Sequence, residues 1–306
     1  MPIKVHDQLP AKSILEGENI FVMTEHLAIH QDIRPLKVLI LNLMPTKIVT
    51  ETQLLRKLSN TPLQIEVEFL QTASYIPQHI DPSHLESFYR TFDEVKDDKY
   101  DGMIITGAPL DYIKFEDVTY WDEVCSIMEW ANTHVHSTLH LCWGAYAAFH
   151  YYYGINTTDH DPKYHGIFEH DIVKKTSPLF RGMDDKFFAP HSHAMEVSAQ
   201  DILNVPQLEL MAISKEAGPT IVKTTDSHHF FMMCHSEYDS NTLALEYERD
   251  LKAGLNPALP VNYFPDDDPS KPPIVRWRSA GQLMFSNWLN YYVYQTTPYD
   301  VRDIQS

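Results

Sequence analysis

Residues 36–44 read Leu-Lys-Val-Leu-Ile-Leu-Asn-Leu-Met, and this stretch decides the fold class. A continuous apolar run of this length is typical of a strand that is covered on both faces, as in a parallel sheet. A helical pattern follows over residues 50–58, with Thr50 as N-cap, and residues 65–69 then alternate apolar and polar side chains. The order strand, helix, strand predicts an α/β fold, with a mostly parallel central sheet and helices on both faces.

The same alternation continues along the chain. Residues 103–105 form another apolar run, which ends at Thr106-Gly107-Ala108-Pro109, where Gly and Pro favour a tight loop. The remaining expected elements are a helix over 117–132, a strand over 138–141, a helix over 143–153, strands over 208–213, 220–224 and 229–233, a helix over 241–252 and a core-facing helix around 283–289.

The domain organisation is simple by these patterns. The sequence has no internal repeat, no low-complexity tract and no clear boundary, so we expect one domain over residues 1–306. An N-terminal extension of about residues 1–35 and a Pro-rich excursion of about residues 255–278 are expected to pack on it.

Charge and composition exclude several classes of function. The chain has 24 Lys and Arg and 42 Asp and Glu, so its net charge is −18. This charge argues against nucleic-acid and anionic-membrane partners. No stretch reaches the ~18 apolar residues that a membrane span needs. The first 18 residues lack the apolar segment of a signal peptide, and three cysteines suit a reducing compartment. We therefore expect a soluble cytoplasmic enzyme. The sequence is compatible with a homodimer but does not decide the oligomeric state.

The clearest chemical signal is Cys142 within Leu-His-Leu-Cys-Trp-Gly-Ala, residues 139–145. A cysteine between a buried strand and a helix lies on a sharp turn at the carboxyl edge of the sheet, with its sulfur presented to solvent. The positive end of the helix dipole there favours a thiolate, so Cys142 is a candidate nucleophile. The alternative is a small buried side chain, which is the interpretation that fits Cys125 inside its helix better.

A second signal is Cys-His-Ser-Glu-Tyr, residues 234–238, at the end of an expected strand. Alternate residues of a strand face the same side, so His235 and Glu237 can both point toward a nucleophile, with Glu237 orienting the imidazole. His-x-Glu alone is a weak signal in a chain with 17 histidines.

Other site classes have little support. Histidines cluster at 134–140, 160–170 and 191–193, but neither paired cysteines nor His-Glu-x-x-His occur, so no metal site is expected. The sequence also lacks Gly-x-Gly-x-x-Gly, a phosphate loop and Gly-x-Ser-x-Gly.

Long blocks of the chain closely resemble the homoserine O-acyltransferase family of the homoserine transsuccinylase type, in methionine biosynthesis. The blocks are residues 1–4, 20–24, 30–36, 41–47, 106–109, 188–192, 247–250, 262–269 and 286–291. The resemblance implies a class I glutamine amidotransferase-like fold, whose Cys, His and Glu triad occurs in the order seen here. It also implies transfer of an acyl group from acyl-CoA, the co-substrate, to the hydroxyl of homoserine through a thioester, with no bound cofactor.

The resemblance assigns roles to individual residues. Cys142 corresponds to the nucleophile, His235 to the base and Glu237 to its partner. Residues at positions used for substrate are Lys163, Ser192 and Arg249, whose guanidinium suits a carboxylate but alternatively pairs with Glu246 or Asp250.

Position 111 is associated in the family with the choice of donor. A Glu there accompanies acetyl-CoA and a Gly accompanies succinyl-CoA. Asp111 keeps the carboxylate, which repels the free carboxylate of a succinyl group, so acetyl-CoA is the expected donor. A lysine such as Lys47 or Lys114 would weaken this preference by neutralising Asp111.

The chain departs from the family near the triad. The family usually has Gly-His-Pro-Glu-Tyr at 234–238, Arg at the position of His193 and Gln at that of Tyr146. Serine therefore remains an alternative acceptor and succinyl-CoA an alternative donor. A hydrolase with the same triad and a catalytically silent binding relative are further alternatives.

Overall fold

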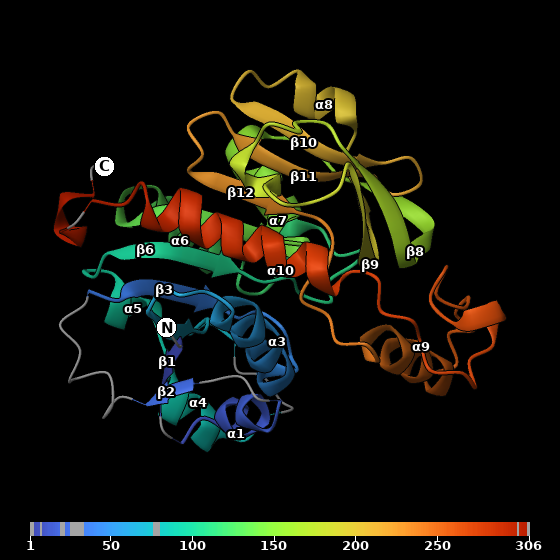
Figure 1. Ribbon diagram of the computed structural model, residues 1–306, viewed down its shortest axis with the longest axis horizontal. Coiled ribbons are helices and arrows are strands. Elements are labelled where there is room, and N and C mark those ends of the chain that lie inside the picture. The colour runs from blue at the N-terminus through green and yellow to red at the C-terminus, as the bar shows by residue number, and fades with distance from the viewer. Residues whose placement is uncertain are drawn as a thin grey trace.

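The structure is a computed structural model that describes residues 3–6, 8–18, 22–24, 34–75, 80–298 and 300–304. It shows one large sheet with helices on both faces (Figure 1). Residues 1–2, 7, 19–21 and 25–33 of the predicted extension at 1–35 lie outside the described residues, and with them parts of the family blocks at 1–4, 20–24 and 30–36. None of the helices in the described ranges has the length and apolar character required to cross a membrane.

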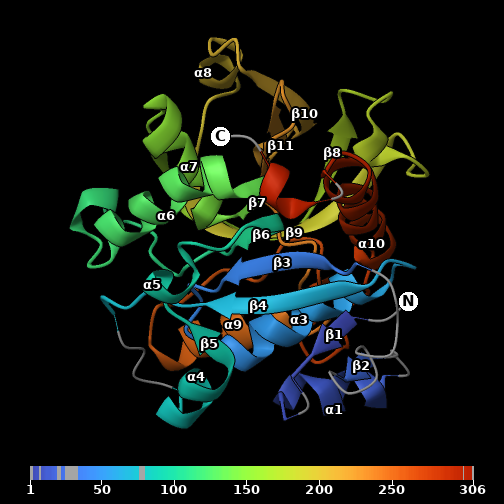
Figure 2. The ribbon, with the colours of Figure 1, turned by 90° about the vertical axis from the view of Figure 1, so that its left-hand side faces the viewer.

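The strands of the described chain follow the order β2-β1-β4-β3-β6-β7-β12-β11-β10-β8-β9, and β5 pairs with β4. Neighbours from β2 to β12 are parallel, whereas those from β12 to β9 are antiparallel. Figure 2 shows the parallel part around β3 and β4. The strands are β1 (Ile3–Val5), β2 (Val22–Thr24), β3 (Leu36–Leu41), β4 (Ile65–Leu70), β5 (Tyr89–Arg90), β6 (Tyr100–Ile105), β7 (Val135–Leu141), β8 (Thr158–Ile172), β9 (Lys186–Glu196), β10 (Leu208–Ser214), β11 (Gly218–Thr224) and β12 (His229–Met232).

Helices connect and cover these strands. They are α1 (Pro10–Gly17), α3 (Lys47–Ser59), α4 (Pro82–Phe88), α5 (Phe92–Val95), α6 (Trp121–His134), α7 (Trp143–Tyr153), α8 (Ala199–Leu203), α9 (Thr242–Lys252) and α10 (Arg278–Asn287). Shorter turns are η1 (Phe115–Asp117), η2 (Pro178–Phe180), η3 (Pro265–Asp267), η5 (Val301–Asp303) and the π-helical η4 (Trp288–Tyr294).

Most predicted elements are confirmed within a few residues, and three differences stand out. Helix α3 begins at Lys47 rather than at Thr50, because Thr46 occupies the N-cap position. Residues 118–120 precede α6 instead of belonging to it. The long antiparallel pair β8 and β9 was not predicted, because β8 begins with mostly exposed polar residues.

Strand β3 carries the alternation that builds two cores. Val38 and Ile40 belong to the cluster on one face of the sheet, and Leu39 and Leu41 belong to the cluster on the other face. All four side chains are fully buried. Since successive strand residues face opposite sides, a continuous apolar run is what a sheet covered on both faces requires.

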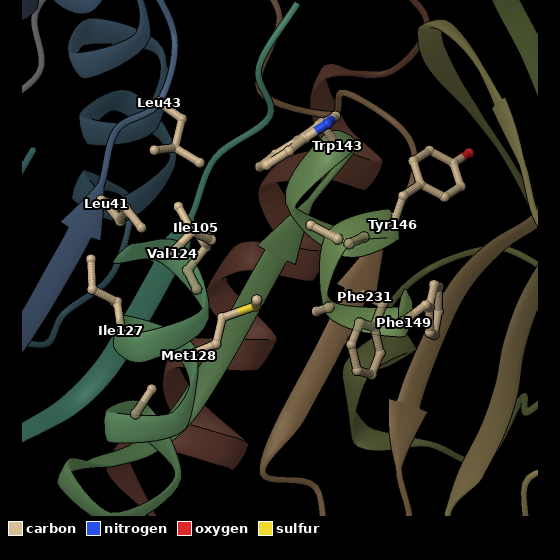
Figure 3. Packing of buried hydrophobic residues seen from close by; sticks show 14 of the residues in the cluster. Leu41, Leu43, Ile105, Val124, Ile127, Met128, Trp143, Tyr146, Phe149 and Phe231 are labelled. Atoms are coloured by element: carbon tan, nitrogen blue, oxygen red, sulfur yellow. The ribbon is translucent and has the colours of Figure 1, made fainter. Parts of the chain in front are cut away.

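Helices α6 and α7 cover the second of these faces. Figure 3 shows Leu41 and Ile105 of the sheet beside Ile127 and Met128 of α6, with Phe149 of α7 against Phe231 of β12. The rings of Phe149 and Phe231 are stacked with centroids 4.4 Å apart. This packing holds the start of α7 against the ends of β6, β7 and β12.

The Pro-rich excursion is anchored by aromatic side chains. Tyr263, Phe264 and Trp277 are buried in a cluster with Ile167 and Tyr238. The indole of Trp277 donates a hydrogen bond to the carbonyl of Tyr238, 3.0 Å away. These three residues thus pack against the segment that follows β12.

Candidate active site

Cys142 lies between β7 and α7 in a strained backbone conformation, with φ 47° and ψ −115°. Such a conformation costs roughly 1–3 kcal/mol for a residue other than glycine and is typical of functional turns. The amide of Cys142 donates to the carbonyl of Met232 at 2.7 Å, which ties the turn to β12. The predicted sharp turn is confirmed. The thiol, however, is not broadly exposed: the residue is 6% exposed and faces a cavity.

Two glycines let the backbone approach this turn closely. A Cβ at Gly144 would lie 2.8 Å from the carbonyl oxygen of Thr106 and 2.9 Å from that of Ile105, so only glycine allows α7 to pack here. A Cβ at Gly107 would lie 3.7 Å from the sulfur of Cys142. The Gly-containing loop after β6 therefore forms one wall around the nucleophile.

His235 and Glu237 are paired, but not for the predicted reason. Strand β12 ends at Met232, and both residues lie in the turn that follows it. The amide of His235 donates to the carbonyl of Pro190 at 2.8 Å, and that of Tyr238 donates to the carbonyl of His235 at 3.2 Å. This turn brings His235 Nδ1 to 2.7 Å from Glu237 Oε1. The expectation of strand alternation was wrong, because the chain leaves the sheet before these residues.

The electrostatics of His235 suit a base next to a thiol. Burial acts to lower its pKa, but charge interactions and hydrogen bonds with Cys142 and Glu237 outweigh burial and raise the pKa well above its ordinary value. The imidazole also stacks on the ring of Tyr238, with centroids 4.1 Å apart. His235 is therefore held between the nucleophile and the carboxylate, in an arrangement able to accept a proton from Cys142.

The two triad members Cys142 and His235 line a cavity of about 400 Å³. Its walls come from the loops after β3, β6, β7 and β12, which end at one edge of the sheet, together with β8, β9 and α9. Carboxyl edges of parallel strands are the usual site of ligand binding in such sheets. The structure brings the predicted substrate residues to this cavity as well: Asp111, Lys163, Ser192 and Arg249.

Lys163 and Arg249 share one carboxylate. Lys163 Nζ lies 3.2 Å from Asp250 Oδ2, and Arg249 Nε donates to Asp250 Oδ1 at 2.8 Å. Of the two partners considered for Arg249, the structure selects Asp250. The Arg249 side chain remains 61% exposed at the cavity, so its guanidinium is accessible to a ligand.

Glu246 is a cavity residue that sequence reasoning considered only as a partner of Arg249. Its Oε2 accepts a hydrogen bond from Ser192 Oγ at 2.6 Å, and its Oε1 accepts one from Tyr238 at 3.0 Å. Burial acts to raise its pKa, but hydrogen bonds from His165 and Ser192 outweigh burial and lower the pKa to about 2. The available signal was its spacing of three residues from Arg249, which places both on one helix face.

Asp111 lies in the cavity wall, where its Oδ1 accepts a hydrogen bond from the amide of Ala194 at 2.9 Å. Burial raises its pKa above the ordinary value, although the Ala194 amide and the charge of Lys163 oppose this effect. The cation that acts on Asp111 is thus Lys163, not Lys47 or Lys114. Lys47 is turned away, since its ammonium donates to the carbonyl of Asn42.

Tyr146 and His193 contact each other beside Cys142, with 3.2 Å between the hydroxyl and Nδ1. His193 Nδ1 also donates to the carbonyl of Met195 at 2.7 Å, which leaves Nε2 to accept from His191 Nδ1 at 2.8 Å. Burial lowers the pKa of His193 to about 3, so this ring is neutral. Within the described ranges, no three His, Cys, Asp or Glu side chains gather as a metal ion would require.

Comparison with known proteins identifies the relatives of the chain. The sequence profile described as homoserine O-succinyltransferase matches residues 2–299. The chain is 54% identical over 305 residues to the homoserine O-acetyltransferase of Acetivibrio thermocellus, with 100% of both chains covered. It is 54% identical over 304 residues to that of Methanomethylophilus alvi, covering 99% and 98% of the two chains. A glutamine amidotransferase structure from Thermotoga maritima superposes with a TM-score of 0.52 at 11% identity, covering 84% of this chain and 98% of that one, which shows the shared fold.

Proposed function

The chain belongs to the homoserine O-succinyltransferase family, and on that premise we propose that it transfers an acetyl group from acetyl-CoA to the hydroxyl of L-homoserine. This activity places the protein in methionine biosynthesis, with residues 1–306 acting as one acyltransferase domain. The observation that carries the proposal is the contact of His235 with both Cys142 and Glu237. Cys142 and His235 line a cavity that Asp111, Glu246 and Arg249 also line.

The proposed reaction has two halves. In the first, His235 takes the thiol proton, the sulfur of Cys142 attacks the thioester carbonyl of acetyl-CoA, and the CoA thiolate leaves with that proton. In the second, His235 takes the proton of the homoserine hydroxyl, whose oxygen attacks the acetyl-cysteine. O-acetylhomoserine leaves and the thiol of Cys142 is restored. Glu237 holds the imidazole and stabilises its cation in both halves.

The charges of the cavity suit an amino acid as acceptor. Glu246 stays ionised and is available to the α-ammonium group, while the exposed guanidinium of Arg249, with Lys163 beside it, is available to the α-carboxylate. A homoserine bound in this way presents its hydroxyl to His235. Serine has a side chain one methylene shorter, so its hydroxyl reaches less far toward the thioester.

The wall beside Cys142 favours a small, uncharged acyl group. Asp111 brings a carboxylate to this wall, and the neutral His193 and Tyr146 supply no positive charge to pair with a succinyl carboxylate. Lys163 is the nearby cation, but Asp250 already shares its charge. These features support acetyl-CoA over succinyl-CoA.

Release of free CoA thiol tests the proposal. With acetyl-CoA we expect continuous thiol release only when homoserine is present, and a burst of at most one equivalent per enzyme without it. Continuous release without an acceptor would indicate a hydrolase, and no release would indicate a binding protein. Faster turnover with serine than with homoserine would refute the proposed acceptor.

A further inference from the structure

Glu237 has one carboxylate oxygen that the triad leaves unused. Its Oε1 accepts the hydrogen bond from His235, whereas Oε2 is buried and accepts no hydrogen bond from any described residue. A buried carboxylate oxygen without a partner is costly, and such an atom calls for a hydrogen-bond donor or a water molecule.

Lys57, near the end of α3, supplies a cation on this side. The residue is 4% exposed, and its ammonium makes no hydrogen bond or ion pair with another described residue. Of the attractive charge interactions of this ammonium, the one with Glu237 is the strongest. A lysine that is almost fully buried, with no partner for its ammonium among the described residues, is unusual enough to require an explanation.

Close backbone packing places Lys57 against the triad segment. A Cβ at Gly281 of α10 would lie 2.8 Å from the Cβ of Ser236, the residue between His235 and Glu237. The same position lies 3.2 Å from the Nζ of Lys57. Because Gly281 has no side chain, the Lys57 ammonium has room close to the turn that carries His235 and Glu237.

Lys57 and Glu237 also line one cavity, separate from the one at Cys142. Its volume is about 820 Å³, which is ample for water between two polar groups. The other charged groups facing this cavity are Glu18, Arg56, Asp239 and Arg278. The guanidinium of Arg56 forms ion pairs with Glu18 Oε2 at 2.5 Å and with Asp239 Oδ1 at 2.6 Å. Arg278 is exposed. The buried cation on the Glu237 side of this cavity is therefore Lys57.

We propose that Lys57 is a positioning residue of the catalytic triad, which interacts through water in this rear cavity with Oε2 of Glu237 and so directs Oε1 toward His235. The inference rests on the proposed function of the triad. Lys57 does not line the cavity at Cys142, so it acts on the reaction through Glu237 and not through either substrate. Burial lowers the pKa of Lys57 to about 8, with Glu237 opposing this effect, so the support weakens as the ammonium loses its proton above that pH.

The test is a double-mutant cycle with Lys57→Met and Glu237→Gln. We expect Lys57→Met to lower kcat about 10-fold, as is typical for the loss of an outer partner of a catalytic group. The KM values for both substrates stay unchanged. The melting temperature stays equal or rises, since a buried unpaired charge is removed. The kcat of the wild type should fall above pH 8, as Lys57 loses its proton. The kcat of Lys57→Met should not show this fall. In the Glu237→Gln background, Lys57→Met should change kcat less than about twofold.

The control is Lys174→Met, which removes an exposed lysine and should leave kcat unchanged. Lys57→Gln, which keeps a hydrogen-bond donor without the charge, serves the same cycle if Lys57→Met does not fold. Full activity of Lys57→Met would overturn the role of Lys57. The same holds if the losses of kcat in Lys57→Met and Glu237→Gln are additive in the double variant. Full activity of Glu237→Gln would instead overturn the triad itself, so the two failures are distinguishable.

Discussion

Replacement of Asp111 by Asn tests the proposed donor with little disturbance of the structure. Asn has the same size as Asp, and its Oδ1 is able to accept the hydrogen bond that the amide of Ala194 donates at 2.9 Å. The substitution thus removes the negative charge while the position of the loop is kept. Asp111→Gly removes the side chain as well and adds room to the cavity.

The magnitude follows from the distance between two carboxylates. A succinyl group on Cys142 would bring its free carboxylate into the cavity that Asp111 also lines. For a separation on the order of 6 Å, like charges at an effective dielectric constant of ~20 repel by about 3 kcal/mol. This energy corresponds to roughly 100-fold in kcat/KM. Lys163 offsets part of the repulsion, so we expect the acetyl-over-succinyl ratio to fall roughly 10- to 100-fold in Asp111→Asn. The room created in Asp111→Gly should lower the ratio further.

The assay compares kcat/KM for acetyl-CoA and succinyl-CoA at saturating homoserine. Asp97→Asn, which removes an exposed carboxylate in the turn after α5, is the matched control and should leave the ratio unchanged. Burial raises the pKa of Asp111, so its negative charge is lost as the pH falls through that raised value. The preference for acetyl-CoA over succinyl-CoA should therefore decrease as the pH falls. A wild type that prefers succinyl-CoA, or a ratio unaltered in Asp111→Asn, would refute the reasoning.

Three further outcomes are expected. Cys142→Ala should abolish both thiol release and the acyl label that mass spectrometry detects on the enzyme. Cys234→Ala should retain both, because burial raises the pKa of the Cys234 thiol to about 12. An acyl label on Cys234 would contradict this assignment. Arg249→Lys should raise the KM for homoserine about 10-fold with little change in kcat, since Lys lacks the planar fork; an effect confined to the acyl-CoA half-reaction would argue against the role. Gly144→Ala should lower the free energy of unfolding by about 1–3 kcal/mol in chemical denaturation, because the added Cβ meets two carbonyl oxygens. Gly17→Ala, where nothing lies within 4 Å, is its control, and equal stability of the two variants would show that the close approach is unimportant.

Features that depend on local patterns were predictable from the amino-acid sequence. The apolar run of β3 predicted a strand buried on both faces, and the strand, cysteine and helix around Cys142 predicted the turn that the structure contains. Both signals are local, because side-chain periodicity and backbone conformation depend on neighbours in the chain. The pairing of His235 with Glu237 was predicted correctly although its stated cause, strand alternation, was wrong.

The pairing of charged side chains at the site, by contrast, depends on the three-dimensional packing of the chain. Asp250 forms ion pairs with both Lys163 and Arg249. Glu246 accepts a hydrogen bond from the Ser192 hydroxyl. Lys57 of α3 interacts electrostatically with Glu237, which lies in the turn after β12. These partners are up to 180 residues apart in the chain, and no periodicity records which of many carboxylates will face a given cation. Their choice depends on how helices pack on the sheet and on how closely glycines such as Gly281 allow backbones to approach. Burial then sets the ionisation of each group, which is why the chemistry of the site is a property of the fold.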